Sequence, residues 1–169
     1  MIRELRLTDA ERMLACLLDE SVTFHMPIRN SHPTIEKCRA FVEQSHEDKQ
    51  NKHFAIVDES DRWIGTVSLK NIENKEAEYA IITCAEAHGK GYAKQATIDI
   101  LRYGFEQLGL DKIYLYVAVS NVRANKFYQK FGFRFDRCDP KSMVINGNEE
   151  DINWYYLLKA DLDKYVQKI

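Results

Sequence analysis

The sequence HGKGYAK, residues 88–94, lies between a strand-like segment and a long helical pattern. Its two glycines are among only seven in a chain of 169 residues. A glycine turn leading into a helix exposes free N–H groups at the positive end of the helix dipole, where an anion such as phosphate is favoured. The absence of β-carbons at Gly89 and Gly91 lets an anion approach closely, and Lys90 and Lys94 add positive charge. A left-handed turn before a surface helix explains the same spacing equally well.

The spacing of these glycines excludes two common nucleotide-binding loops. A P-loop requires GxxxxGK followed by Ser or Thr, and the chain has no such spacing. A dinucleotide fingerprint requires a third glycine at position 94, where Lys94 stands instead. What remains is a strand, a short glycine turn and the start of a helix.

A second motif follows the first after one helix and one strand. The segment NVRANKFYQKFGF, residues 121–133, resembles the N-x-x-A-x-x-x-Y-x-K-x-G-F signature of the GNAT acetyltransferase superfamily, and HGKGYA resembles its Q/R-x-x-G-x-G/A loop. The likeness covers nearly the whole chain. Within the superfamily, the chain resembles most the RimJ/RimL type and the bacterial spermidine N-acetyltransferases, and its INGN sequence at residues 145–148 resembles a hairpin of those enzymes. His88 stands where the family prefers Gln or Arg. Because that loop works mainly through main-chain amides, the resemblance still implies cofactor binding.

Periodicity and turn signals predict an α/β protein, a mixed sheet flanked by helices in the order βααβββαβαββ, with residues 1–169 forming a single domain. The expected strands are 2–7, 52–58, 63–72, 77–83, 112–119, 133–136 and a hairpin around Asn146-Gly147. The expected helices begin at Thr8, in a capping box with Glu11, at Thr34, after the glycines and at Asn121, with an irregular stretch over 20–33. The resemblance implies the GNAT fold, in which the strand before the loop bulges and parts from its neighbour.

The resemblance also implies acetyl-CoA as co-substrate. Backbone groups of Ile81, Ile82 and Thr83 would pair with its pantetheine arm, and one amide would point at the thioester carbonyl. Its pyrophosphate would bind to the loop that contains His88, Gly89, Lys90, Gly91, Tyr92, Ala93 and Lys94. Asn121 would cap its helix and reach the cofactor, although capping alone explains an asparagine there. Positive charge near the phosphates would come from His88, Lys90, Lys94, Arg123, Lys126 and Lys130.

Two residues carry the chemistry in this interpretation. The tyrosine that matches Tyr128 donates a proton to the departing CoA thiolate in the family, whereas its place on an apolar stripe with Phe127 and Phe131 equally suits a core tyrosine. Glu78 lies where several relatives keep a water-relaying glutamate. The alternative for Glu78 is an exposed strand carboxylate paired with a lysine. Cys84 lies near the expected thioester but is read as a buried small residue.

The acceptor pocket of this fold is built largely by the segment between the first two helices, here DESVTFHMPIRNSHPT. A polyamine site requires several carboxylates, but after Asp19 and Glu20 this segment offers only His25, Arg29 and His32. A protein N-terminus, a small amine and an amino-sugar conjugate therefore remain open as acceptors, and a polyamine is less favoured.

Composition sets the remaining expectations. A net charge of −2 gives no basic field for nucleic acid, and no run is long enough to span a membrane. Four cysteines without a CxxC motif fit reduced thiols and a cytoplasmic location. The five histidines lack metal-ligand spacing, so no metal is expected, and a homo-oligomer is compatible with the sequence. The alternatives to an enzyme are a non-catalytic acyl-CoA-binding sensor module and a purely structural α/β domain.

Overall fold

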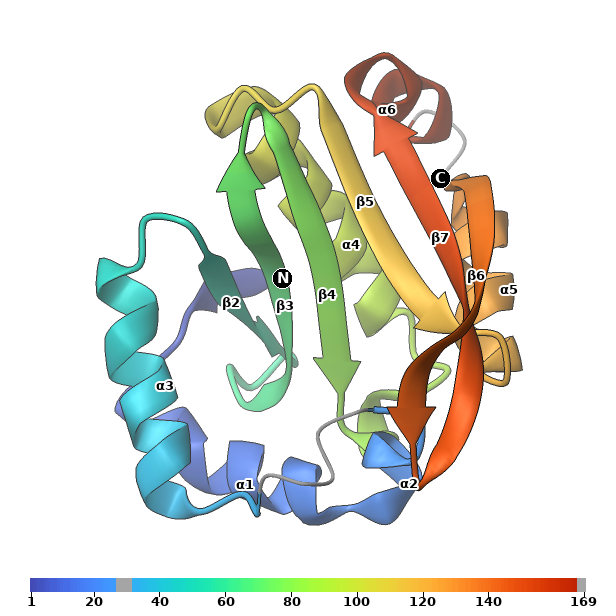
Figure 1. The fold of residues 1–169 in the computed structure, drawn as a ribbon. Coiled ribbons are helices and arrows are strands. Elements are labelled where there is room, and N and C mark those ends of the chain that lie inside the picture. The colour runs from blue at the N-terminus through green and yellow to red at the C-terminus, as the bar shows by residue number, and fades with distance from the viewer. Residues whose placement is uncertain (27–31, 167–169) are drawn as a thin grey trace.

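The computed structural model describes residues 1–26 and 32–166, and of residues 163–166 the backbone alone. Within this part of the chain, seven strands form one mixed sheet in the order β1-β2-β3-β4-β5-β7-β6 (Figure 1). The strands are β1 (Ile2–Glu4), β2 (Lys52–Val57), β3 (Trp63–Glu73), β4 (Glu76–Thr83), β5 (Lys112–Ala118), β6 (Arg134–Ile145) and β7 (Asn148–Leu158). The helices are α1 (Ala10–Leu18), α2 (Glu20–Thr23), α3 (Ile35–Glu47), α4 (Tyr92–Arg102), α5 (Val122–Phe131) and α6 (Lys159–Val166).

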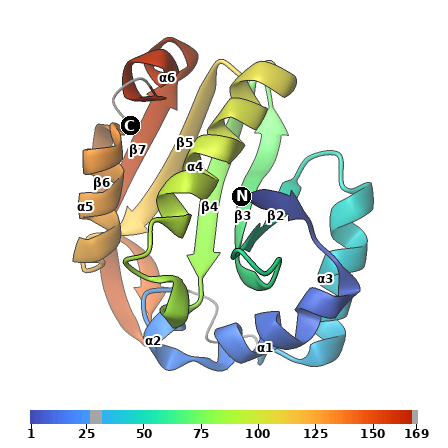
Figure 2. The ribbon, with the colours of Figure 1, turned by 180° about the vertical axis from the view of Figure 1, so that it is seen from behind.

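Two apolar cores cover opposite faces of the sheet because side chains alternate along each strand. Ile56 in β2 belongs to the core beneath α4 and α5, which cover the face turned to the viewer in Figure 2. Its neighbour Ala55 belongs to a second core that includes Met13 of α1 and Cys38 of α3. The sheet therefore separates an α4–α5 side from an α1–α3 side. None of the described helices is both long and apolar enough to cross a bilayer.

The strands β4 and β5 run parallel and diverge, as Figure 1 shows. They pair only where Glu76–Glu78 face Lys112–Tyr114, although β4 continues to Thr83 and β5 to Ala118. β5 stays paired with β7 along its whole length, so the β5-β7-β6 part of the sheet swings away from β4 as a unit. The expected splayed pair is confirmed. The expected bulge does not lie there, because β4 keeps its register with β3 from Glu78 to Thr83.

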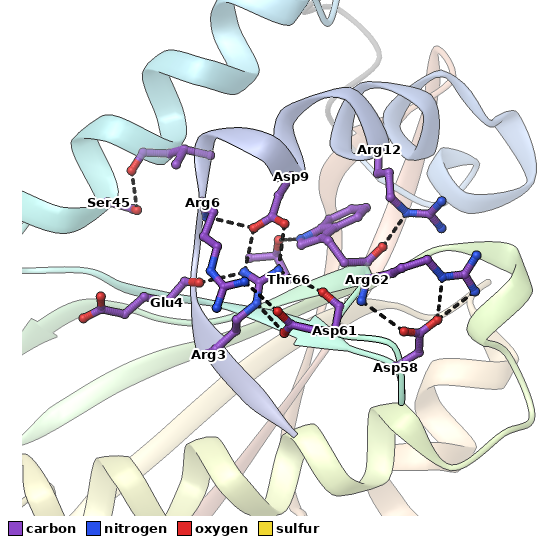
Figure 3. A network of polar contacts seen from close by, with 12 residues as sticks. Arg3, Glu4, Arg6, Asp9, Arg12, Ser45, Asp58, Asp61, Arg62 and Thr66 are labelled. Carbon is purple, nitrogen blue, oxygen red and sulfur yellow. Dashed lines mark hydrogen bonds and ion pairs between the residues drawn. The ribbon is translucent and has the colours of Figure 1, made fainter.

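The start of the chain is held by a network that differs from the expected capping box (Figure 3). The carboxylate of Asp9, rather than Thr8 or Glu11, accepts from the Arg6 backbone N–H at 2.8 Å and caps the 3-10 turn Leu7–Asp9 before α1. Arg3 donates to both Asp9 oxygens, at 2.8 and 2.9 Å, and to Asp61. The prediction of a Thr8–Glu11 box was wrong because a guanidinium on the neighbouring strand fixes the adjacent aspartate instead.

Other boundaries agree with the sequence pattern or extend it. Thr34 accepts from the Lys37 N–H and starts α3, and the two-residue turn Asn146-Gly147 joins β6 to β7, both as predicted. Three features were not predicted, namely α2 inside the supposedly irregular stretch, α6 after β7, and the continuation of β6 from Arg134 to Ile145. The described elements therefore follow the order βαααβββαβαββα.

Candidate active site

A cavity of about 1150 Å³ follows the gap between the diverging strands and reaches the N-termini of α4 and α5. It is lined by most of the residues that the sequence singled out: Glu78, Ile81, Ile82, Thr83, His88, Gly89, Gly91, Ala93, Lys94, Asn121 and Tyr128. Lys90 and Tyr92 do not line it. The Tyr92 hydroxyl instead donates to Glu59 at 2.7 Å, so this side chain points toward the β2–β3 turn.

The glycine loop has the backbone that its two glycines suggest. Gly89 and Gly91 have φ of +74° and +86°, a left-handed conformation that residues with a β-carbon rarely adopt. A β-carbon at either position would meet no heavy atom within 4 Å, so the space in front of the loop is open. Gly91 is the residue before α4, and no side chain among the described residues caps that helix. Its first amides are therefore available to an anion.

The cavity is positively charged although the whole chain has a net charge of −2. Its lining holds Lys70, Lys94, Arg123 and Lys130 among the described residues, against the one carboxylate of Glu78. Lys94 and Arg123 lie in the first turns of α4 and α5, near the glycine loop, where the phosphates of a nucleotide-like ligand would need them. Lys130 lies in the last turn of α5.

His88 links the two sequence motifs. Its Nδ1 accepts a hydrogen bond from the Arg123 guanidinium at 2.8 Å, which requires a neutral imidazole. Burial, and next the charge of Arg123, lowers the pKa of His88 below its ordinary value. His88 is therefore a neutral hydrogen-bonding group that orients Arg123, and the loop's positive charge comes from its lysines and arginine.

Asn121 performs the capping role that its position predicts. Its side-chain oxygen accepts from the Ala124 N–H at 3.1 Å and starts α5, while the residue also lines the cavity. A second asparagine, Asn125, is buried and accepts from Asn153 at 2.8 Å and from the Tyr155 hydroxyl at 2.9 Å. This network attaches α5 to β7 and so fixes the helix that carries Tyr128.

Tyr128 is both packed in the core and exposed to the cavity, so it fits both roles that the sequence left open. Its ring packs edge-on against Tyr79 and Phe133, with centroids 6.0 and 5.7 Å away, and only 8% of the residue is exposed. It nevertheless lines the cavity, and none of the hydrogen bonds within the described part of the chain involves its hydroxyl. Burial raises the pKa of Tyr128 above its ordinary value, so the hydroxyl keeps its proton at neutral pH. The hydroxyl is free to donate to a bound ligand.

Glu78 is buried, which differs from the exposed carboxylate considered as its alternative, but it does pair with a lysine. Lys70 Nζ lies 2.5 Å from one carboxylate oxygen, and Asn71 donates to the other at 2.9 Å. Glu78 is also the last residue of β4 that pairs with β5, so its carboxylate lies where the gap begins. Cys84 does not line this cavity and packs against the α1–α3 core, but it is only half-buried, whereas the sequence interpretation was a buried residue.

The sequence analysis missed the partner of Glu78. Lys70 and Glu78 face each other across the β3–β4 hairpin, whose strands and turn were both predicted. Counting outward from the turn would have paired Asn71 with Glu78, because residues at equal distance from a hairpin turn lie opposite each other. A register shift between Lys70 and Glu73 brings Lys70 opposite Glu78 instead, and no local pattern indicates that shift. Met143 of β6 also lines the cavity, and no local sequence pattern indicates it.

Comparison with known proteins gives the family. Residues 1–134 match the acetyltransferase (GNAT) domain, which is more than half of the chain. The chain belongs to the GNAT acetyltransferases. As a member of that family it is an N-acetyltransferase, and it has the α/β GNAT fold with a seven-stranded mixed sheet.

The relatives of this GNAT chain include spermidine acetyltransferases. It is 34% identical over 123 residues to the spermidine N(1)-acetyltransferase of Vibrio cholerae, which covers 72% of this chain and 69% of that protein. It is 37% identical over 123 residues to the spermidine N(1)-acetyltransferase of Escherichia coli, covering 66% and 64% of the two chains. The crystal structure of the Vibrio cholerae spermidine N-acetyltransferase in complex with CoA and spermine is similar with a TM-score of 0.87, at 26% identity and 96% coverage of both chains.

Proposed function

We propose that this enzyme binds acetyl-CoA in the cavity between β4 and β5 and transfers the acetyl group directly to a primary amine. The observation that carries the proposal is the unpaired edge of β4 opposite the free hydroxyl of Tyr128. An extended pantetheine arm can hydrogen-bond to the backbone of Ile81, Ile82 and Thr83 as an added strand. The open glycine loop and the amides at the start of α4 suit the pyrophosphate.

The transfer then needs one nucleophile, one base and one acid. The neutral amine nitrogen attacks the thioester carbonyl carbon, a C–N bond forms, and the C–S bond breaks. The proton that the amine loses passes through water to Glu78, and Tyr128 gives its hydroxyl proton to the departing sulfur. A backbone N–H on the unpaired edge of β4 stabilises the oxyanion that develops on the carbonyl. No covalent intermediate with the protein is required.

The acceptor must lose a proton before it can attack. At pH 7 this costs about 4.6 kcal/mol for an amine with a pKa near 10.4, and about 1 kcal/mol for an N-terminal amine. The buried Glu78 lies at the mouth of the gap, where it can accept through water the proton that the nitrogen loses as the C–N bond forms. The unpaired state of the four cysteines also supports the proposed cytoplasmic location, where thiols stay reduced.

Binding of acetyl-CoA is tested by thermal stability. A ligand at a concentration of 100 times its Kd stabilises the folded state by about 2.7 kcal/mol. We therefore expect the Tm to rise when either CoA or acetyl-CoA is added. Release of free CoA thiol in the presence of an amine separates an enzyme from a sensor module, which would bind without turnover. No change in Tm at millimolar acetyl-CoA would refute the proposed cofactor site.

Replacing Glu78 by glutamine is expected to lower kcat at pH 7 by about tenfold, because the base that accepts the amine proton is lost. The effect stays moderate since water can still carry the proton and Lys70 already balances the carboxylate charge. The deficit should shrink as the pH rises toward the pKa of the amine, because the acceptor is then neutral without help. Initial rates from pH 7 to 9.5 measure this trend.

Glu76→Gln is the matched control. Glu76 lies on the same strand, but its side chain is 44% exposed and pairs with Lys112 at 3.4 Å outside the cavity. The control should keep the pH–rate profile of the unmodified enzyme. A deficit in Glu78→Gln that is constant across this pH range would exclude a base at Glu78 and leave only a role in positioning.

A further inference from the structure

A second cavity of about 390 Å³ lies on the α1–α3 side of the sheet. Its floor is formed by Thr66 and Ser68 of β3 with Ala80 of β4, and its walls include Leu17 of α1 and Phe41 of α3. It shares Met26, Lys70, Ala80, Ile81 and Ile82 with the larger cavity, so the two spaces meet along β4. The unpaired stretch of β4, where the thioester would lie, is thus the common boundary.

The register of the strands shows how the two spaces communicate. Ser68 pairs with Ala80 and Lys70 pairs with Glu78, so all four side chains point to the α1–α3 face. The Lys70–Glu78 ion pair therefore lies at the end of the floor, next to the gap between β4 and β5. An amine held at this ion pair would have the gap on one side and the second cavity on the other.

The walls of this second cavity are apolar. Leu17, Phe41 and Ile82 are each only half-buried, so they present apolar surface to the space. The described residues that line it include no carboxylate. The acidic residues of the preceding segment are turned elsewhere, because Asp19 caps α2 by accepting from Ser21 at 2.9 Å and neither it nor Glu20 lines either cavity.

The few polar groups in the lining are already paired within the protein. His53 Nδ1 and Ser68 Oγ are 2.7 Å apart, and the Trp63 indole donates to Thr66 at 3.2 Å. Burial lowers the pKa of His53, so its ring is neutral and packs against Phe41 with centroids 4.7 Å apart. Lys37 Nζ donates to the His32 carbonyl at 2.8 Å. A ligand in this space would meet apolar surface and satisfied polar groups.

We propose that this second cavity holds the carbon skeleton of the acceptor, and that the acceptor is a primary amine with a single apolar group, either aromatic or branched aliphatic. This inference rests on the proposed function, since it places the amino group beside Lys70 and Glu78 and facing the thioester. The apolar group then gains the free energy of burying its surface against the walls. A polyamine would instead place a second ammonium group in a space without a carboxylate, where its lost hydration is not replaced.

The test compares amines of different character with the same enzyme. CoA release is measured with phenethylamine and isoamylamine as apolar amines, spermidine and putrescine as polycations, and glucosamine as an amino sugar. We expect kcat/KM for phenethylamine to exceed that for spermidine by at least about tenfold. Stabilisation by acetyl-CoA is measured in parallel. If acetyl-CoA neither stabilises the protein nor is consumed with any amine, the proposed function itself is overturned.

A result in which acetyl-CoA binds and spermidine, putrescine or glucosamine is acetylated in preference to both apolar amines overturns only the inference about the acceptor. The pocket is tested separately with Leu17→Ala and Leu14→Ala, two half-buried leucines on α1 that both pack against the α1–α3 core. Only Leu17 lines the cavity. Leu17→Ala should raise KM for phenethylamine about fivefold to tenfold and leave KM for acetyl-CoA unchanged, while Leu14→Ala leaves both unchanged. An equal rise in both variants would overturn the assignment of the pocket.

Discussion

Replacing Gly91 by valine is expected to weaken binding of CoA by about 10²-fold or more, with little loss of folded protein. Gly91 has φ of +86°, and a β-branched residue is strained there by more than the roughly 1–2 kcal/mol that an L-residue pays in the left-handed region. The valine relieves this strain by moving the loop, which turns the first amides of α4 away from the phosphate. If the loop holds, the branched side chain occupies the open space in front of those amides.

Gly109→Val is the control for strain alone. Gly109 has φ of +66° and open space around its β-carbon position, as Gly91 does, but it does not line the cavity. Both variants should lose similar amounts of Tm, and only Gly91→Val should lose CoA affinity, measured as Kd by calorimetry. Equal Kd values for the two variants would show that the pyrophosphate binds away from this loop.

The sequence predicted the parts of the fold that depend on local patterns. Glycines with positive φ, the Asn121 and Thr34 caps and the Asn146-Gly147 hairpin each depend on residues within a few positions of one another, and all four appear in the structure. The separation of β4 from β5 was inferred from the family resemblance, because no local pattern in either strand indicates where their pairing ends.

The elements that were missed depend on contacts between distant residues. α6 is short, and its Asp161 pairs with Arg134 at the start of β6, a contact that no local pattern predicts. The sequence pattern predicted a strand at 133–136 and a separate hairpin around Asn146-Gly147. Pro140, which lacks an N–H, and Lys141, which has φ of +50° in the structure, lie between these segments. The strand continues past both because it lies at the edge of the sheet and shifts its register between Asp139 and Met143.

The candidate site also has one part that local sequence patterns predict and one part that depends on contacts between distant residues. The end of the large cavity where we propose that the phosphates bind lies on contiguous motifs, so nearly all of its residues could be named from the sequence. The second cavity, where we propose that the acceptor binds, is assembled from α1, α3, β2, β3 and β4, and its apolar character depends on which strand residues share a face. That information comes from the register between Ser68 and Ala80 and between His53 and Ser68. The charge of the segment between the first two helices therefore gives no information about the apolar walls of this cavity.

Replacing Tyr128 by phenylalanine is expected to lower kcat by about 10²- to 10⁴-fold while leaving the affinity for acetyl-CoA nearly unchanged. In water, transfer of a proton from a tyrosine with a pKa near 10 to a thiolate with a pKa near 8.5 costs about 2 kcal/mol. Burial raises the pKa of Tyr128, but the same dry surroundings also disfavour the thiolate, so the tyrosine can still act as the acid. The acceptor amines used in the assay do not need the Tyr128 hydroxyl in order to bind.

Stability separates this role from that of a core tyrosine. Within the described part of the chain the Tyr128 hydroxyl has no hydrogen-bond partner, so its removal should change Tm little. Tyr155→Phe is the matched control, because its ring lies 6.2 Å from that of Tyr128 and its hydroxyl is bonded to Asn125 and Gln129 outside the cavity. That variant should lose about 1 kcal/mol of stability and far less kcat than Tyr128→Phe, because Asn153 still bonds Asn125 and holds α5 against β7. A folded Tyr128→Phe enzyme with the kcat of the unmodified protein would mean that the thiolate receives its proton from water, and that Tyr128 serves only to pack α5 against the sheet.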